Sequence, residues 1–271
     1  MTEDAKKLNV AAQGQPAKPQ PAKGRAAKAK KVKQEESIFD IIKTVVSVVA
    51  IVLVVRTFIF EPFNIPSGSM KPTLLVGDFV FVSKFSYGIS KFSFPFFNPP
   101  FSGRVFGSMP NRGDVVVFRL PRDTSVDYIK RVVGLPGDRI QMIDGVLNIN
   151  GQAVKLERAE DGVDTDFGPV PEFIETLPNG VQHPIFKRPG HHDYDDTGVY
   201  VVPEGNIFAM GDNRDNSLDS RVKPEQGGVG FVPVENLVGR AEIRWFSFDD
   251  KDPWYYGPFG VRYSRLFTGV H

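Results

Sequence analysis

The sequence predicts a mainly β protein, in which one membrane-spanning helix precedes a β-sheet domain that carries an inserted, smaller β lobe. Three observations predict this class. The chain of 271 residues has one long apolar segment, near its start. Beyond that segment, Gly and Pro recur so often that long helices are disfavoured. Short apolar runs, many of them alternating with polar residues, dominate the rest, as is typical of strands.

Residues 1–36 form a basic tail. They hold nine Lys or Arg and four Asp or Glu, a net charge of +5, whereas the remainder of the chain carries −4. The tail is rich in Ala, Pro and Gln and has almost no large apolar side chains, so we predict that it is disordered. Nucleic-acid binding is one interpretation. A solvated tail that fixes membrane topology is favoured, because the apolar segment follows at once.

Residues 37–60 are predicted to be a transmembrane helix. A helix from Ile38 to Phe60 would be about 34 Å long, enough to cross the hydrocarbon core of a bilayer. Only six residues of this stretch are polar or charged: Asp40, Lys43, Thr44, Ser47, Arg56 and Thr57. The uninterrupted apolar centre, residues 45–55, is short and by itself also fits a buried helix or the core of a cleaved signal peptide.

Two features favour an uncleaved single-pass anchor. Lys43 and Arg56 lie near the two ends of the segment, from where their side chains reach the membrane interfaces. Residues 61–66, which follow, lack the small-residue pattern of a cleavage site. Because positive charge stays on the cytoplasmic side, we predict a cytoplasmic tail and an extracytoplasmic domain over residues 61–271.

The outer domain is expected to contain at least eight strands. They are predicted at residues 79–83, 114–120, 128–133, 139–143, 146–149, 199–202, 206–210 and 242–248. Asp144-Gly145 between two of these segments predicts a hairpin turn. Residues of about 151–197 are polar, acidic and Pro-rich with weak periodicity, and we predict that they form the inserted lobe of short strands and loops.

Nine phenylalanines lie between Phe79 and Phe106. The segment Lys91–Phe101 is too Pro-rich for a central strand, so a loop or hairpin must carry many of these rings. Two interpretations stay open: the loop inserts into the lipid interface, or it folds back over its own core. In the first case, four more aromatic residues would join it at the interface: Trp245, Trp254, Tyr255 and Tyr256.

Three motifs carry the candidate chemistry. The first is Pro-Ser-Gly-Ser-Met-Lys-Pro-Thr-Leu at residues 66–74, a tight turn with two serines just after the apolar segment. The second is Tyr-Ile-Lys-Arg-Val-Val-Gly-Leu-Pro-Gly-Asp at 128–138, with a lysine inside a strand. The third is the polar loop Gly-Asp-Asn-Arg-Asp-Asn-Ser-Leu-Asp-Ser-Arg at 211–221. Cys is absent, so any nucleophile is an oxygen or an amine.

Together and in this order, the three motifs resemble the sequence boxes of type I signal peptidase (leader peptidase), a family of membrane-bound serine proteases that remove signal peptides. The resemblance runs from about Arg56 to about Phe248 and does not cover the tail. It implies a β-sheet catalytic domain and an endopeptidase that cuts exported preproteins at the outer face of a bacterial cytoplasmic membrane. It also implies the lipid bilayer as a partner and proximity to the secretion translocon.

By resemblance, Ser69 is the nucleophile and Lys130 the general base. A lysine with the ordinary pKa near 10.4 is a cation at neutral pH and cannot act as a base, so Lys130 must be buried. Its strand position between Tyr128 and Val132 on one face predicts that burial. Lys71, two residues from Ser69, is the rival base; its place in a turn before Pro72 predicts that it is solvated and cationic.

The remaining site residues are also assigned by resemblance. Ser67 and the backbone N–H of Ser69 would form the oxyanion hole, although without the resemblance Ser67 would be expected only to hydrogen-bond within its turn. Ser217 would hydrogen-bond the Lys130 amine and orient it. The supporting residues would be Asp212, Arg214, Asp219 and Arg221. The substrate pockets would be lined by Phe63, Ile65, Pro66, Met70, Leu74, Val117, Tyr128 and Ile129, although these residues fit a core equally well.

Other functions are less well supported by the sequence. A metal site in residues 191–196 (His-His-Asp-Tyr-Asp-Asp) is not expected, because adjacent loop residues rarely converge on one ion, and we expect no cofactor. A self-cleaving Ser-Lys repressor would need a DNA-binding domain where this chain has an apolar segment, and no nucleic-acid partner is expected. The main alternative is a non-enzymatic, membrane-anchored β domain that acts as a scaffold or assembly module.

Overall fold

The structure is a computed structural model, and it describes residues 37–94, 99–164, 167–249 and 260–271. Two compact units make up the chain, residues 1–44 and 45–271. The disorder predicted for the tail, and the interfacial role predicted for Trp254, Tyr255 and Tyr256, concern residues outside the described ranges.

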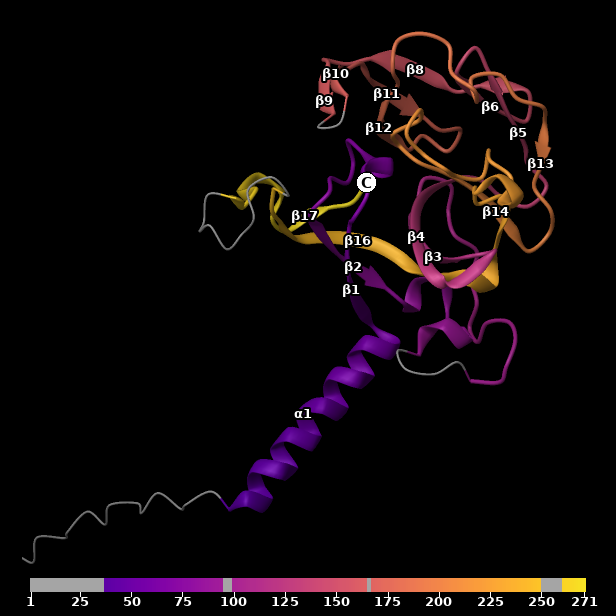
Figure 1. Ribbon diagram of the computed structural model, residues 1–271. Helices are drawn as coiled ribbons and strands as arrows, with labels where there is room; N and C mark the ends of the chain where they lie inside the picture. The colour runs from indigo at the N-terminus through magenta and orange to yellow at the C-terminus, as the bar shows by residue number, and fades with distance from the viewer. Residues whose placement is uncertain (1–36, 95–98, 165–166, 250–259) are drawn as a thin grey trace, which may run out of the picture. The chain divides into compact units, whose positions relative to one another are not determined.

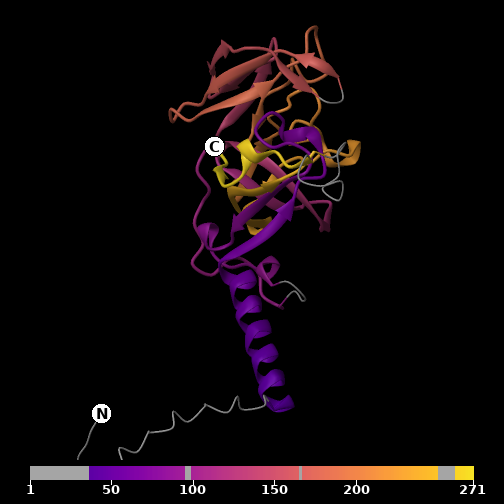
Figure 2. The same ribbon diagram turned by 90° about the vertical axis from the view of Figure 1, so that its left-hand side faces the viewer.

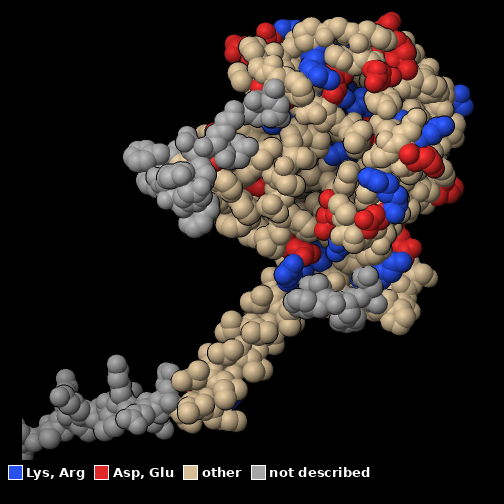
Figure 3. All heavy atoms as spheres, viewed as in Figure 1, with Lys and Arg blue, Asp and Glu red and all other residues tan. Residues whose placement is uncertain are grey.

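Helix α1 runs from Ile38 to Phe58. It is long and apolar enough to cross a membrane, and its apolar side chains are almost all exposed. In Figure 3 its surface is nearly free of charged atoms. Asp40 in the first turn and Arg56 in the last turn complement the helix dipole. The helix is shorter than the expected 37–60, because Phe60 already pairs with Ser83 in the first strand.

The largest sheet has eight strands, all in antiparallel pairs. Its order is β1 (Phe60–Asn64), β2 (Asp78–Ser83), β16 (Leu237–Ser247), β3 (Val115–Leu120), β4 (Asp123–Gly134), β14 (Asn206–Met210) and β15 (Val232–Pro233). Strand β17 (Thr268–Gly269) pairs with β16 beside this path. The long strand β16 therefore joins chain segments that are far apart in the sequence (Figure 1).

A second sheet has the order β13 (Tyr200–Val201), β5 (Arg139–Ile143), β6 (Val146–Ile149) and β7 (Gln152–Ala153). The hairpin between β5 and β6 turns at Asp144 and Gly145, which have φ of 50° and 73°. Positive φ at both central residues is what a tight hairpin turn requires, and an Asp-Gly pair adopts it readily. The predicted hairpin is thus confirmed.

Two small sheets lie within the segment expected to form the inserted lobe. One has the order β12 (Gln182–Phe186), β11 (Glu172–Thr176) and β8 (Lys155–Arg158), and the other pairs β10 (Gly168–Val170) with β9 (Gly162–Asp164). Both views of the ribbon show these strands, pink to orange, grouped at the end of the β domain away from the start of β1 (Figures 1 and 2). The segment consists of short strands and loops, as its composition predicts.

The remaining elements are single turns of 3₁₀ helix: η1 (Gly68–Met70), η2 (Phe85–Tyr87), η3 (Lys91–Ser93), η4 (Pro224–Gln226), η5 (Val234–Asn236) and η8 (Tyr263–Arg265). The mainly β class predicted from the sequence is confirmed. Each of the eight predicted strand segments contains a strand, although β4 and β16 are longer than expected and β1, β15 and β17 were not predicted.

The apolar core lies in three clusters of buried side chains. One cluster packs between β2, β3 and β16 and takes in Met70 and Leu74, both fully buried, from the turn around η1. A second packs around β3, β4 and β14, and a third joins β14 to the β5–β6 hairpin. The first cluster also contains Ile65, so it holds the serine-containing turn by buried side chains before and after the two serines.

The Phe-rich segment is described only in part, since residues 95–98 lie outside the described ranges. Phe92 is 5% exposed and therefore folds back onto the protein, whereas Phe85 and Phe106 are 58% and 90% exposed. Trp245 stacks on Phe81, with ring centroids 5.4 Å apart. Neither of the two interpretations left open by the sequence is decided by these positions.

Candidate active site

The turn that carries Ser69 is fixed at both ends by buried apolar side chains. Ile65 before it is 2% exposed, and Met70 after it is fully buried. Ser67 and Ser69 lie between these anchors, with Ser67 exposed and Ser69 half-buried. The polar residues therefore reach the surface on a short backbone segment that the core holds in place.

Lys130 lies in the interior half of strand β4. It stands opposite Val116 of β3, which is fully buried, and is itself 3% exposed. Its Nζ lies 5.4 Å from the centroid of the Tyr128 ring. Burial lowers the pKa of Lys130 to about 8, an effect that Asp219 and Asp212 oppose and Arg221 reinforces. At pH 7 about a tenth of this amine is therefore uncharged, far more than for a lysine with the ordinary pKa.

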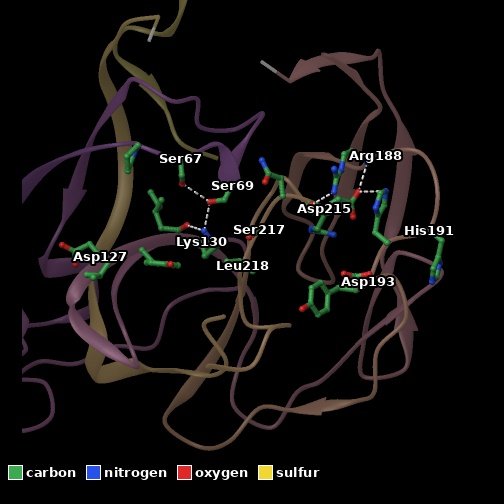
Figure 4. A pocket seen from close by; sticks show the side chains of 18 residues that line it. Ser67, Ser69, Asp127, Lys130, Arg188, His191, Asp193, Asp215, Ser217 and Leu218 are labelled. Carbon is green, nitrogen blue, oxygen red and sulfur yellow. Dashed lines mark hydrogen bonds and ion pairs between the residues drawn. The ribbon is translucent and has the colours of Figure 1, made fainter. Parts of the chain in front are cut away.

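The Lys130 amine and the Ser69 hydroxyl are in direct contact (Figure 4). Lys130 Nζ donates to Ser69 Oγ at 2.7 Å and to the backbone carbonyl of Ile129 at 2.9 Å. The Ser67 hydroxyl lies 3.4 Å from Ser69 Oγ. The arrangement combines a weakly basic buried amine with a hydroxyl within proton-transfer distance.

The polar loop at 211–221 is built from buried ion pairs. Asp219 accepts two hydrogen bonds from the Arg221 guanidinium, each 2.9 Å long, and one each from the backbone N–H groups of Arg221 and Gly211. Arg221 in turn donates to the carbonyl of Arg214 at 2.6 Å. Burial alone would raise the pKa of Asp219, but the pairing with Arg221 outweighs it and lowers that pKa. Asp219 and Arg221 thus connect the end of the loop to its earlier residues, Gly211 and Arg214.

Two further pairs connect this loop to strands on either side. Asp212 binds Arg131 of β4 through both carboxylate oxygens, at 2.9 and 2.7 Å. Arg214 binds Glu175 of β11 through two hydrogen bonds of 2.6 Å. All four side chains are buried. Arg131, the residue after Lys130, therefore links strand β4 to the 211–221 loop.

Ser217 is close to the pair but does not contact Lys130 as expected. It lines the same cavity, yet its Oγ is buried with no hydrogen-bond partner among the described residues. The Lys130 amine is instead held by the Ile129 carbonyl. The orienting role of Ser217 stays a prediction, and in this structure the backbone carbonyl takes its place.

A cavity of about 660 Å³ opens beside the Ser69–Lys130 pair. In Figure 4 Asp127 lies on one side of the pair, and Arg188, Asp215, His191 and Asp193 lie on the other. The residues that line the cavity are Pro66, Ser67, Ser69, Val126, Asp127, Tyr128, Ile129, Lys130, Arg188, His191, His192, Asp193, Tyr194, Arg214, Asp215, Asn216, Ser217 and Leu218. The pair therefore faces an elongated cavity with walls on both sides.

Of the eight residues assigned to substrate pockets, three line this cavity: Pro66, Tyr128 and Ile129. Ile65, Met70, Leu74 and Val117 lie in the core cluster beneath it, and Phe63 packs against that cluster. Four of the eight residues are therefore core residues, which is the alternative that the sequence had left equally open.

The prediction that the Lys71 side chain is solvated was wrong. Its side chain is 2% exposed and its Nζ lies 2.8 Å from Oδ1 of Asp164, itself 1% exposed. The position of Lys71 in a turn predicted a solvated side chain. In the structure, the carboxylate of Asp164 at the end of strand β9, 93 residues away in the sequence, pairs with it. A carboxylate partner stabilises the charged form of an amine, which is then a poor base. Lys71 is therefore a weaker candidate for the general base than Lys130.

Sequence reasoning also missed one wall of the cavity. Residues 191–194 were considered only for metal binding, and the structure places all four of them on the cavity wall, next to Arg188 and Asp215. Among the described residues no cluster of three or more His, Asp or Glu side chains could hold a metal ion. The concentration of polar residues in that loop was the one available signal.

The fold and the site define a class of protein: a mainly β protein in which a buried lysine amine contacts a serine hydroxyl, the arrangement that a Ser-Lys hydrolase requires. A sequence model of the family described as "Signal peptidase, peptidase S26" matches residues 38–246. The chain belongs to this family of serine endopeptidases.

Individual relatives agree with that assignment. Signal peptidase I of Rickettsia typhi is 48% identical over 266 residues, which cover 89% of this chain and 95% of the relative. Signal peptidase I of Rickettsia prowazekii is 46% identical with the same coverage. A solved signal peptidase I from Enterococcus faecalis is 26% identical and covers 49% of this chain and 97% of that one, with a TM-score of 0.29. The low TM-score means that the sequence relatives carry the assignment.

Proposed function

We propose that this protein removes N-terminal signal peptides from exported preproteins at the outer face of the cytoplasmic membrane. The observation that carries the proposal is the 2.7 Å contact between a buried amine, Lys130, and the Ser69 hydroxyl. The relatives named Signal peptidase I support the substrate class. A non-enzymatic scaffold would gain nothing from burying a lysine against a serine, because burial of an amine costs free energy.

The chemistry proceeds by covalent acyl transfer. The neutral Lys130 amine takes the proton of Ser69 Oγ as that oxygen attacks the scissile carbonyl carbon. The Ser69 N–H and the Ser67 hydroxyl then stabilise the oxyanion, and each such donor contributes about 2.7 to 4 kcal/mol. The lysine ammonium passes its proton to the leaving amine, and it later activates the water that releases the acyl group.

The substrate lies along strand β4. Residues 127–130 of β4 pair with β3 on one side, and no strand of the described residues pairs with them on the other. An extended peptide added at this free edge would pass directly beside Lys130. Val126 and Asp127 line the cavity at that edge, so the acyl side of the substrate lies there and the leaving side lies toward Arg188.

The membrane topology belongs to the same proposal. The protein is anchored by α1, with the basic residues 1–36 on the cytoplasmic side and the β domain outside. The asymmetry of charge, +5 before the helix against −4 in the rest of the chain, supports this orientation. Preproteins emerging from the secretion translocon would reach the site on that face.

The test is cleavage of a secretory precursor by the full chain in detergent or liposomes. Ser69→Ala and Lys130→Met are each expected to abolish cleavage while the circular dichroism spectrum stays unchanged. Lys155→Met is the control, because Lys155 is exposed and its ion pair with Glu157 lies at the surface. Cleavage at the unsubstituted rate by either site variant would exclude that residue from the catalytic pair, whereas absence of cleavage by the unsubstituted protein would favour the scaffold alternative.

A further inference from the structure

The turn that carries Ser69 is contacted by a residue of the segment expected to form the inserted lobe. Asp164 ends the short strand β9 and is 1% exposed. Its Oδ1 accepts from Lys71 Nζ at 2.8 Å, and its Oδ2 accepts from Asn213 Nδ2 at 2.8 Å. Both carboxylate oxygens are therefore bound to residues of the catalytic region.

Asn213 extends this contact to the backbone of the serine turn. Its Nδ2 also donates to the Gly68 carbonyl at 3.1 Å, and its backbone N–H donates to the Ser69 carbonyl at 3.1 Å. One residue thus hydrogen-bonds to two successive carbonyls, immediately beside the nucleophile. Because these carbonyls are fixed, the N–H of Ser69 and the direction of its side chain are fixed as well.

Lys71 holds the same turn from the opposite end. A Cβ placed on Gly68 would lie 2.9 Å from Lys71 Cε, so the lysine stem packs directly against the backbone of the turn. A buried ammonium stays in such a position only when it is paired and hydrogen-bonded. Asp164 supplies that pairing, and it is the shared partner of Lys71 and Asn213.

We propose that Asp164 is a positioning residue for catalysis: through Lys71 and Asn213 it clamps the backbone on both sides of Ser69. This inference rests on the proposed endopeptidase function and adds a role for the inserted segment in it. Within the described part of the chain, no hydrogen bond or ion pair joins Asp164 to Lys130, so its effect should act on the nucleophile and leave the base unchanged.

The experiment measures preprotein cleavage by the full chain over a range of pH, with Asp164→Asn as the main variant. We expect kcat to fall by about 10- to 100-fold with KM within about twofold, since a displaced nucleophile lowers the rate of chemistry more than binding. The pH midpoint of the activity should stay where it is in the unsubstituted protein. A purely structural role would leave kcat unchanged below the unfolding temperature.

Asp138→Asn is the matched control. Asp138 is also a mostly buried carboxylate, paired with Arg112 at 2.9 Å, but it contacts neither the serine turn nor the 211–221 loop. It should lower the melting temperature and leave kcat within about twofold. If Asp164→Asn does not fold, Asn213→Ala replaces it, because that change removes the bond to the Gly68 carbonyl without changing any charge.

The outcomes separate the two proposals. If the unsubstituted protein cleaves the preprotein and Asp164→Asn or Asn213→Ala has the same kcat, then the positioning role of Asp164 is wrong. The proposed endopeptidase function is not affected by that result. A shifted pH midpoint also overturns the positioning role, because the effect would then act through Lys130. Absence of cleavage by the unsubstituted protein overturns both.

Discussion

Gly211 lies so close to Ser69 that a Cβ placed on Gly211 would be 2.5 Å from the Ser69 carbonyl oxygen. The same Cβ would overlap the Ser217 hydroxyl. The polar loop and the serine turn are therefore in backbone contact, and only a residue without a side chain permits that approach.

The first prediction concerns this contact. Gly211→Ala must push the Ser69 carbonyl away, and a displacement of about 1 Å at a reacting group costs on the order of 100-fold in rate. We expect kcat for precursor cleavage to fall by about that factor. Gly198→Ala is the control, because a Cβ there meets nothing within 4 Å and the backbone is unstrained. Equal rates for both variants would contradict the prediction.

The lowered pKa of the Lys130 amine predicts how the cleavage activity depends on pH. With burial lowering the pKa of Lys130 to about 8, only the deprotonated form accepts the Ser69 proton. Activity measured as kcat/KM should therefore rise from pH 6 to 9 with a midpoint near 8, and at pH 7 only about a tenth of the amine is neutral. A rate that stays constant over this range would mean that Lys130 is not the base.

Lys130→Met should stabilise the fold while it abolishes activity. Burial lowers the pKa of Lys130 from its usual 10.5 to about 8, so below pH 8 the folded state holds an ammonium that it disfavours by about 3 kcal/mol. Between pH 8 and 10.5 the unfolded chain binds more protons, so this cost disappears as pH rises. Urea unfolding should show a gain of at most about 3 kcal/mol at pH 7 and little gain at pH 10.5.

An equal gain at the two pH values would contradict that reasoning, because the transfer of a methionine side chain into the core does not depend on pH. Lys155→Met is again a suitable control, since its amine is exposed and its removal should change stability by less than about 1 kcal/mol.

The buried pair of Arg131 and Asp212 predicts a large loss of stability when one partner is removed. Arg131→Met leaves the Asp212 carboxylate buried without its main partner, which costs about 3 to 5 kcal/mol. Burial by itself would raise the pKa of Asp212, but Arg131 outweighs it and lowers that pKa. The stabilisation is therefore present above the ordinary pKa of an aspartate, near 3.9, and the variant and the unsubstituted protein should converge in stability as pH falls through the lowered pKa of Asp212.

The far wall of the cavity predicts a dependence on substrate length. Arg188 lines the cavity on the opposite side of Ser69 from Asp127 (Figure 4). Arg188→Ala should lower kcat/KM severalfold for peptides with several residues after the scissile bond, and less for peptides that end just after it. Arg139→Ala, an exposed arginine outside the cavity, is the control. An equal effect on long and short peptides would place the leaving side elsewhere.

Local sequence determined a large part of this protein. The apolar run at 38–58, the alternation of apolar residues in the strands and the Asp-Gly turn at 144–145 depend on neighbours a few residues away, and these elements were predictable. The contact between Ser69 and Lys130 was anticipated only through the resemblance to signal peptidase, because strand alternation predicts that a lysine is buried but not what it faces.

Tertiary structure alone decided the partners of the charged residues. Lys71 was expected in solvent, since nothing near it in sequence compensates a buried ammonium. The compensating carboxylate, Asp164, comes from the inserted segment, as does Glu175, the partner of Arg214. The physical reason is that burial of a charge depends on what packs against it, and the packing elements are separated by 93 and 39 residues of chain. Which lysine lies against the Ser69 hydroxyl was therefore decided by the fold: among the described residues, Lys71 pairs with a carboxylate, whereas Lys130 forms no ion pair and contacts Ser69.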